Sequence, residues 1–276
     1  MKQKNKYSEY EFIIQNVIKN GKVFFSNKSY DYRGGMYGSK ICTAFVGFWS
    51  AFEQAQKEMA SSGMVANLPL LIAAKSKADK NSYLWKEEFF NSFSTDCVVI
   101  DEKGKFRRKG DSLLVTVHSG FIPAYHVSDR LTNEDLENLL AGILPKGYEI
   151  PVYNVEDVRK NNIPNPFGKY AIWCDLKRGH HYSEDIYKSK SIFMDDDQVL
   201  ARVGSLEYLE KYFDKAKGIQ GIYKDNLGIQ RLFEGNYSGL YCLSRVNSLF
   251  LNRDFEGIRH IGNVNHIGNF IGVKLK

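Results

Sequence analysis

The chain has 276 residues, of which 43% are hydrophobic and 25% are charged, as in ordinary folded globular proteins. Its 14% of aromatic residues and its six prolines exclude a largely disordered chain, because disordered segments lack the apolar side chains of a core. The 38 Lys and Arg residues exceed the 32 Asp and Glu residues and give a net charge of +6, which favours a polyanion such as DNA or RNA as partner.

The sequence predicts a cytoplasmic protein without a membrane partner. No apolar stretch approaches the roughly 20 residues of a membrane-spanning helix, and the first residues are polar where a signal peptide would be apolar. The cysteines lie far apart in apolar surroundings, which is typical of reduced, buried thiols and not of disulfides or a zinc site: Cys42, Cys97, Cys174 and Cys242. The composition leaves open whether the chain forms a homo-oligomer.

The first third of the chain shows mainly helical patterns. Apolar residues recur at steps of three and four and predict a core helix over residues 41–60. A short strand and a glycine-rich loop are expected before it, at 22–26 and 30–40. Further helices are expected at 8–20, 68–78 and 82–93. Residues 1–93 are therefore predicted to form a helix-rich segment.

The pattern changes to strands after this segment. Strands at 96–100 and 112–117 flank a polar connection that contains glycine, which indicates a hairpin with a longer loop. A helix capped by Thr132 is expected to run to about Leu144, where Pro145 ends it. Later elements are a helix at 206–217 and strands at 148–152, 169–177, 240–243, 249–251 and 270–273.

This order of elements predicts an α+β fold. A helix-rich N-terminal third over residues 1–93 is expected to precede a mixed or antiparallel sheet region over residues 94–276. No proline-rich or glycine-rich linker separates the two segments, so we expect one continuous globular unit.

Asp175 and Lys177 end the most informative apolar run, at residues 169–177. Successive side chains of a strand point to opposite faces, so these two are expected to stand together on one face at the strand end. Such a pair can hold a divalent metal beside a water molecule. The alternative is a solvated ion pair at the end of a strand.

An apolar run followed by Asp, one apolar residue and Lys resembles the signature of the PD-(D/E)xK nuclease superfamily, here over about residues 134–177. The resemblance implies that Asp157 and Asp175 hold Mg²⁺, a hard cation that prefers oxygen ligands. It also implies that Lys177 activates the attacking water and stabilises charge on the phosphate. A second copy of the short pattern, at residues 98–103, shows how permissive it is.

The connection between the two strands of the expected hairpin is strongly basic. Its cationic side chains could contact successive phosphates, while its aromatic ring could stack on a base. The candidate nucleic-acid-binding residues are Lys103, Lys105, Phe106, Arg107, Arg108 and Lys109. A solvated loop that keeps the hairpin soluble is the alternative.

Two further groups of residues are candidates for a role in catalysis or metal binding. The pair His180–His181 follows Lys177 closely, and His180 is a candidate general base or phosphate contact in the same site. The acidic run at residues 195–197 precedes a helical pattern, which favours capping of a helix N-terminus over metal binding.

The basic loop, the aromatic residues and the Asp-x-Lys strand end together suggest a protein that acts on nucleic acid. The sharpest form of this hypothesis is a Mg²⁺-dependent endonuclease that hydrolyses phosphodiester bonds. The alternative is a non-catalytic protein, such as a viral or phage structural component or an interaction module, in which these carboxylates are merely surface groups. A small-molecule enzyme built around the histidines has no spacing in its favour.

Overall fold

A computed structural model of the chain describes residues 24–25, 63–81, 83–86, 89–118, 133–144, 147–176, 184–187, 190–216, 227–230, 244–251, 256–261 and 271–274. The helices expected at 8–20 and 41–60, the glycine-rich loop at 30–40 and the strand at 240–243 lie outside these residues. Among the described residues, no helix is long and apolar enough to cross a membrane.

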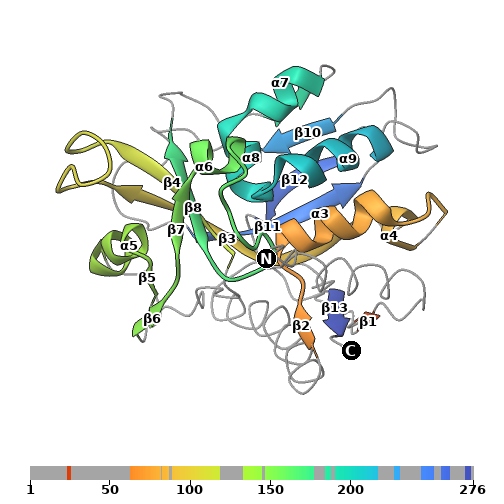
Figure 1. Cartoon of the computed structure of the whole chain (residues 1–276), viewed down its shortest axis with the longest axis horizontal. Coiled ribbons are helices and arrows are strands. Elements are labelled where there is room, and N and C mark those ends of the chain that lie inside the picture. The colour runs from red at the N-terminus through yellow and green to blue at the C-terminus, as the bar shows by residue number, and fades with distance from the viewer. Residues whose placement is uncertain are drawn as a thin grey trace, which may run out of the picture.

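The described residues form an α+β structure around a mixed sheet (Figure 1). Its strands follow the order β7-β8-β4-β3-β11-β12-β10-β9, and the pairs β7–β8 and β10–β12 are parallel while the other pairs are antiparallel. These strands are β3 (Phe89–Ile100), β4 (Ser112–Val117), β7 (Val152–Asn154), β8 (Ala171–Asp175), β9 (Glu184–Tyr187), β10 (Leu227–Gln230), β11 (Ser244–Leu251) and β12 (Glu256–Ile261).

Two smaller sheets accompany the main one. The first has the order β1-β13-β2, with β1 at Phe24–Phe25, β13 at Ile271–Lys274 and β2 at Gly63–Val65. It therefore joins strands from the two ends of the chain. The second pairs β5 (Ile143–Leu144) with β6 (Tyr148–Glu149).

Helices cover one face of the main sheet and bury the larger apolar core against it (Figure 1). Leu114 and Ile172 from the sheet meet Leu71, Leu200 and Leu209 from three of these helices. The helices are α3 (Leu68–Lys77), α4 (Tyr83–Lys86), α6 (Val155–Arg159), α7 (Lys190–Asp195), α8 (Asp197–Val203) and α9 (Leu206–Ala216).

A smaller core lies on the opposite face of the sheet. Val99, Val115 and Ala171 from the strands pack with Leu139 and Leu140 of α5 (Asn133–Leu140). The alternation of side chains along each strand therefore sends one set into each core. The face with the smaller core is the one toward which Asp175 points, since Asp175 lies two and four residues beyond Trp173 and Ala171 on β8.

Several expected elements are confirmed by the structure. The strand at 112–117 and the helix at 68–78 correspond to β4 and α3, and the helix at 206–217 corresponds to α9. Asp196 caps α8, because its Oδ1 accepts hydrogen bonds from the backbone N–H groups of Gln198 and Val199 at 2.9 and 3.1 Å. The acidic run is thus a helix cap, as its position predicted.

The helix expected at 82–93 was wrong in its second half. Only α4, at Tyr83–Lys86, is helical, and the chain enters β3 at Phe89. The run Phe-Phe-Asn-Ser-Phe-Ser combines aromatic residues, which favour strands, with Asn and Ser, which weaken a helix. Pairing with β11, where Phe90 faces Leu249, satisfies the backbone in the strand conformation.

The helix expected to end near Leu144 is shorter than predicted. It ends at Leu140, and residues Ile143–Leu144 form β5. Gly142 lies between them with φ +78°, a left-handed conformation that favours glycine and turns the chain out of the helix. The strand expected at 148–152 is likewise divided between β6 and β7.

A polar cluster crosses the larger core between the sheet and α8. The guanidinium of Arg202 donates from Nε to Oδ2 of Asp96 at 2.7 Å, and Thr116 donates to the other carboxylate oxygen at 2.6 Å. Both charged side chains are fully buried. The ion pair thus ties α8 to β3, and the Thr116 hydroxyl brings β4 into the same cluster.

His118, the residue directly after β4, extends this cluster. Its Nε2 lies 2.9 Å from the carbonyl oxygen of Ala201, which can only accept, so Nε2 carries the proton. Its Nδ1 lies 2.7 Å from the hydroxyl of Ser94, which also accepts a hydrogen bond from the N–H of Leu68. Burial lowers the pKa of His118 to about 4, although the Ala201 carbonyl and the charge of Asp96 act in the opposite direction.

Candidate functional site

The basic connection is a tight loop between β3 and β4, built around the carboxylate of Asp101. Its Oδ1 accepts the N–H of Lys105 at 3.0 Å, and its Oδ2 accepts the N–H groups of Phe106 and Arg107 at 2.8 and 2.9 Å. Asp101 is only 2% exposed. Burial alone would raise the pKa of this carboxyl group, but the N–H donors outweigh it and hold the pKa below its ordinary value.

Backbone hydrogen bonds close the same loop. The carbonyl of Asp101 accepts from Gly104 and Gly110 at 3.1 and 2.9 Å, while its N–H donates to the carbonyl of Asp111 at 2.9 Å. Gly104 adopts φ +63°, and a Cβ there would press on the backbone of Lys109. The loop, residues 101–111, is therefore held in one conformation by its own backbone and by Asp101.

Strand register places this loop beside the end of β8. Ile100 pairs with Ser112 at the end of the hairpin, and Leu113 pairs with Asp175 on the neighbouring strand. Phe106 lies edge-on to Trp173, with ring centroids 6.1 Å apart. Because Trp173 shares the face of Asp175, the loop covers the end of β8 that carries the predicted metal ligand Asp175.

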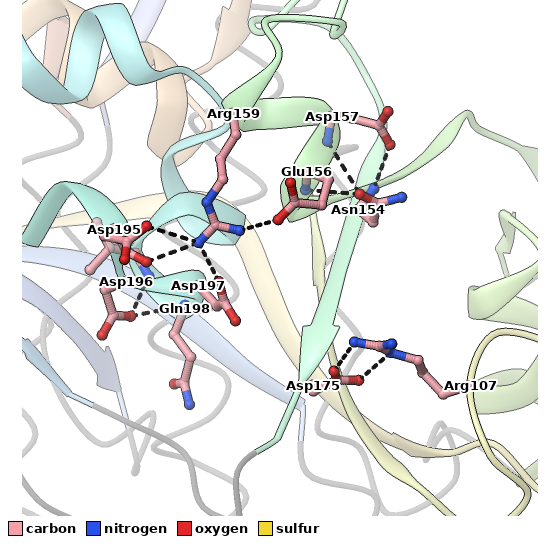
Figure 2. A network of polar contacts seen from close by, with 11 residues as sticks. Arg107, Asn154, Glu156, Asp157, Arg159, Asp175, Asp195, Asp196, Asp197 and Gln198 are labelled. Carbon is pink, nitrogen blue, oxygen red and sulfur yellow. Dashed lines mark hydrogen bonds and ion pairs between the residues drawn. The ribbon is translucent and has the colours of Figure 1, made fainter.

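Arg107 and Asp175 form a bidentate ion pair (Figure 2). The guanidinium Nε donates to Oδ1 at 2.9 Å, and Nη2 donates to Oδ2. The guanidinium carbon also lies 5.7 Å from the ring centroid of Trp173. The hydrogen bond and charge of Asp175 raise the pKa of Arg107 further above its ordinary value, so the guanidinium stays charged.

The basic side chains of the loop fall into two groups. Lys103 forms an ion pair with Glu137 of α5 at 2.8 Å, as Arg107 does with Asp175. Lys105, Arg108 and Lys109 are exposed and form no ion pair within the described part of the chain. Lys103 and Arg107 therefore attach the loop to the rest of the protein, whereas the other three cations are exposed to solvent.

The ring of Phe106 already has an aromatic partner within the protein. It is half-buried and packs with Trp173 against the smaller core. The ammonium of Lys105 lies 5.6 Å from the centroid of the same ring. The described loop therefore offers mainly charge to a partner, and stacking of Phe106 on a base stays a prediction.

Asp157 and Asp175 do not share a site (Figure 2). Asp157 forms a capping box at the start of α6, where its Oδ2 accepts the N–H of Asn154 at 2.9 Å and Asn154 Oδ1 accepts its N–H at 3.2 Å. Its neighbour Glu156 pairs with Arg159 at 2.6 Å. The upstream acidic residues thus act in helix capping and ion pairing.

The described residues do not by themselves make up a Mg²⁺ site. They contain no group of three or more His, Cys, Asp or Glu side chains that could hold a metal ion. Both oxygens of Asp175 already accept hydrogen bonds from Arg107, and Asp157 serves as a cap. The other two catalytic candidates, Lys177 and His180, lie outside the described residues, so their roles stay predictions.

Sequence reasoning missed two partners of the loop. Trp173 supports both Phe106 and Arg107, and its place two residues before Asp175 was sufficient to put it on the same face. The second partner is Glu137, whose Oε2 accepts a hydrogen bond from Lys103. The two buried cysteines in the described residues, Cys97 and Cys174, are free thiols as expected, and burial raises the pKa of Cys174.

Comparisons with known proteins give little further guidance. No protein family matches the chain, and no curated protein is significantly similar to it. A solved structure from work on the accommodation of massive sequence variation in Nanoarchaeota by the C-type lectin fold aligns with 82% of this chain and 92% of its own chain, with 18% identity and a TM-score of 0.48. A TM-score below 0.5 carries no argument about the fold or the function of this chain.

Proposed function

We propose that this protein binds the phosphate backbone of a nucleic acid through the β3–β4 loop. The observation that supports the proposal is the set of three exposed cations on this loop that form no ion pair with another described residue, Lys105, Arg108 and Lys109. A flexible loop would lose conformational freedom on binding, whereas a loop already fixed by Asp101 loses little.

The chemistry of the loop favours contacts to phosphates over contacts to bases. Lys and Arg side chains bind phosphate oxygens without reading sequence, and Phe106 is engaged with Trp173. Three acidic residues, Asp101, Glu102 and Asp111, belong to the same loop, but the carboxylate of Asp101 is buried under it. Binding is therefore expected to be sequence-independent and modest in affinity.

The test is fluorescence anisotropy with labelled duplex DNA and labelled single-stranded RNA at several salt concentrations. Three phosphate contacts release about three counterions, so affinity for the duplex should fall by about 40-fold between 50 and 200 mM salt. The variant Lys105→Ala/Arg108→Ala/Lys109→Ala should lose this salt-sensitive binding.

A matched control carries the same change of charge elsewhere. Lys80, Lys160 and Lys169 are exposed lysines outside the loop, and their triple alanine variant should retain binding. Equal losses in the two variants would show that only net charge matters and would overturn the proposed site. Absence of binding to either probe would favour the alternative, an interaction or structural protein.

Mg²⁺-dependent cleavage of the bound strand is a second proposal. It is favoured by the position of Asp175, which is partly exposed at the end of β8 beside the basic loop. Incubation of both nucleic acids with Mg²⁺ or with EDTA tests it, in the natural protein and in Asp175→Ala. Cleavage that needs the metal and Asp175 would support it, and binding without cleavage would remove it.

A further inference from the structure

The conformation of the loop does not depend on the Arg107–Asp175 ion pair. The backbone N–H of Arg107 donates to Asp101 at 2.9 Å, independently of where the guanidinium lies. Phe106 packs on Trp173, and Lys103 pairs with Glu137, so the loop has two attachments to the rest of the protein besides Asp175. The side chain of Arg107 can therefore change its partner while the loop stays in place.

The ion pair itself is accessible to an incoming anion. The side chains of Arg107 and Asp175 are 51% and 40% exposed. A guanidinium binds a carboxylate and a phosphate in the same two-pronged geometry, so a phosphate can take the position of the Asp175 carboxylate. Exposed ion pairs contribute little net free energy, so replacing the Asp175 carboxylate by a phosphate costs little free energy.

We infer that Asp175 competes with nucleic-acid phosphates for the guanidinium of Arg107 and thereby weakens backbone binding at the β3–β4 loop. The inference rests on the proposed function and adds a fourth cation, Arg107, whose availability is controlled by a neighbouring carboxylate. Trp173 keeps the guanidinium in place through its ring face during the exchange. Asp175 thus acts as an internal competitor of the ligand.

The inference predicts an increase in affinity when Asp175 loses its charge. Asp175→Asn should bind duplex DNA up to about fivefold more tightly at 50 mM salt, the factor that corresponds to an exposed ion pair. The gain should disappear when Arg107→Ala is also present, because the competition needs both partners. Anisotropy titrations of the natural protein, the two single variants and the double variant measure this coupling.

The control removes a negative charge from the same loop without touching the pair. Glu102 is exposed and does not pair with Arg107, so Glu102→Gln should change affinity equally with and without Arg107→Ala. Thermal unfolding of each variant verifies that it is folded. The N–H signal of Arg107 Nε, followed by NMR in the natural protein, should move on addition of the duplex.

The outcomes separate the inference from the proposed function. If Asp175→Asn fails to tighten binding, or tightens it equally in the Arg107→Ala background, competition is refuted while the loop can still be the binding site. If the natural protein shows no salt-sensitive binding to either probe, both ideas fail. A gain that depends on Arg107 supports the inference.

Discussion

Two Arg–Asp pairs connect strands of the main sheet to other elements, and they differ in what surrounds them. The pair Arg202–Asp96 is fully buried between α8 and the central strands. The pair Arg107–Asp175 lies at the end of β8 with both side chains about half exposed. The same chemistry therefore serves a fixed contact inside the protein and an exchangeable contact at its surface.

The difference follows from the cost of leaving a charge alone. A buried charge that loses its partner cannot be solvated, whereas an exposed one turns to water. Asp96 also accepts a hydrogen bond from Thr116, so its carboxylate belongs to a connected cluster. The buried pair is expected to fix the position of α8, and the exposed pair is free to take part in binding.

The largest expected effect is that of breaking the buried pair. Arg202→Met should destabilise the protein by about 3–5 kcal/mol, because it leaves the Asp96 carboxylate buried without its counter-charge. Urea denaturation measures the loss. Arg107→Met is the matched control and should cost less than about 1 kcal/mol. Similar losses for the two variants would show that the buried pair contributes no more to stability than the exposed pair.

The next effect concerns a proton in the same buried cluster. The folded protein resists protonation of His118 until about pH 4, whereas the unfolded chain binds a proton near pH 6.5. The stability that this group contributes is complete above pH 6.5 and is lost as the pH falls toward 4, by roughly 3 kcal/mol. Denaturation curves across this range measure the loss.

His118→Gln isolates this contribution, since the other titrating groups are unchanged. Its difference in unfolding free energy from the natural protein should change between pH 6.5 and 4 and be constant above pH 6.5. A difference that is the same at every pH would show that His118 does not titrate in the folded cluster as its burial demands.

Local signals were sufficient to predict the frame of the site. The hairpin follows from two β-prone runs around a polar connection, and the Asp196 cap follows from an acidic run before a helical pattern. Both involve residues that are close in sequence. On β8, Asp175 shares a face with Ala171 and Trp173, as the alternation along a strand requires, whereas its expected neighbour Lys177 lies outside the described residues.

The partners of these residues could not be predicted, because they lie far away in sequence. Arg107 and Asp175 are 68 positions apart, and Arg202 and Asp96 are 106 positions apart. Asp157 matched a family spacing, but a hydrogen bond with Asn154, three residues before it, determines its role. Sequence patterns identified the charged residues, whereas only the tertiary structure shows which charges are already neutralised.

An intermediate loss of stability is expected at Asp101. This carboxylate is buried, like that of Asp96, but it belongs to the exposed β3–β4 loop, so it separates the effect of burial from that of location. Asp101→Ala should destabilise the loop by about 1–3 kcal/mol, since three N–H groups lose their acceptor. The basic residues of the loop are trypsin sites, so limited proteolysis measures its opening. Glu102→Ala should leave the digestion rate unchanged, and equal rates for both variants would show that Asp101 does not hold the loop.

The smallest effect on stability is expected at Asp175, where the effect on binding is opposite in sign. Asp175→Asn should change the unfolding free energy by less than about 1 kcal/mol, because the pair is exposed and Asp101 holds the loop without it. The same substitution should tighten duplex binding. If the Arg107–Asp175 pair stabilised the fold as strongly as Arg202–Asp96 does, this variant would instead lose several kcal/mol of unfolding free energy. The guanidinium of Arg107 would then not be available for exchange. Parallel measurement of unfolding and affinity for this one variant thus decides whether Arg107 is part of the structural frame or part of the binding surface.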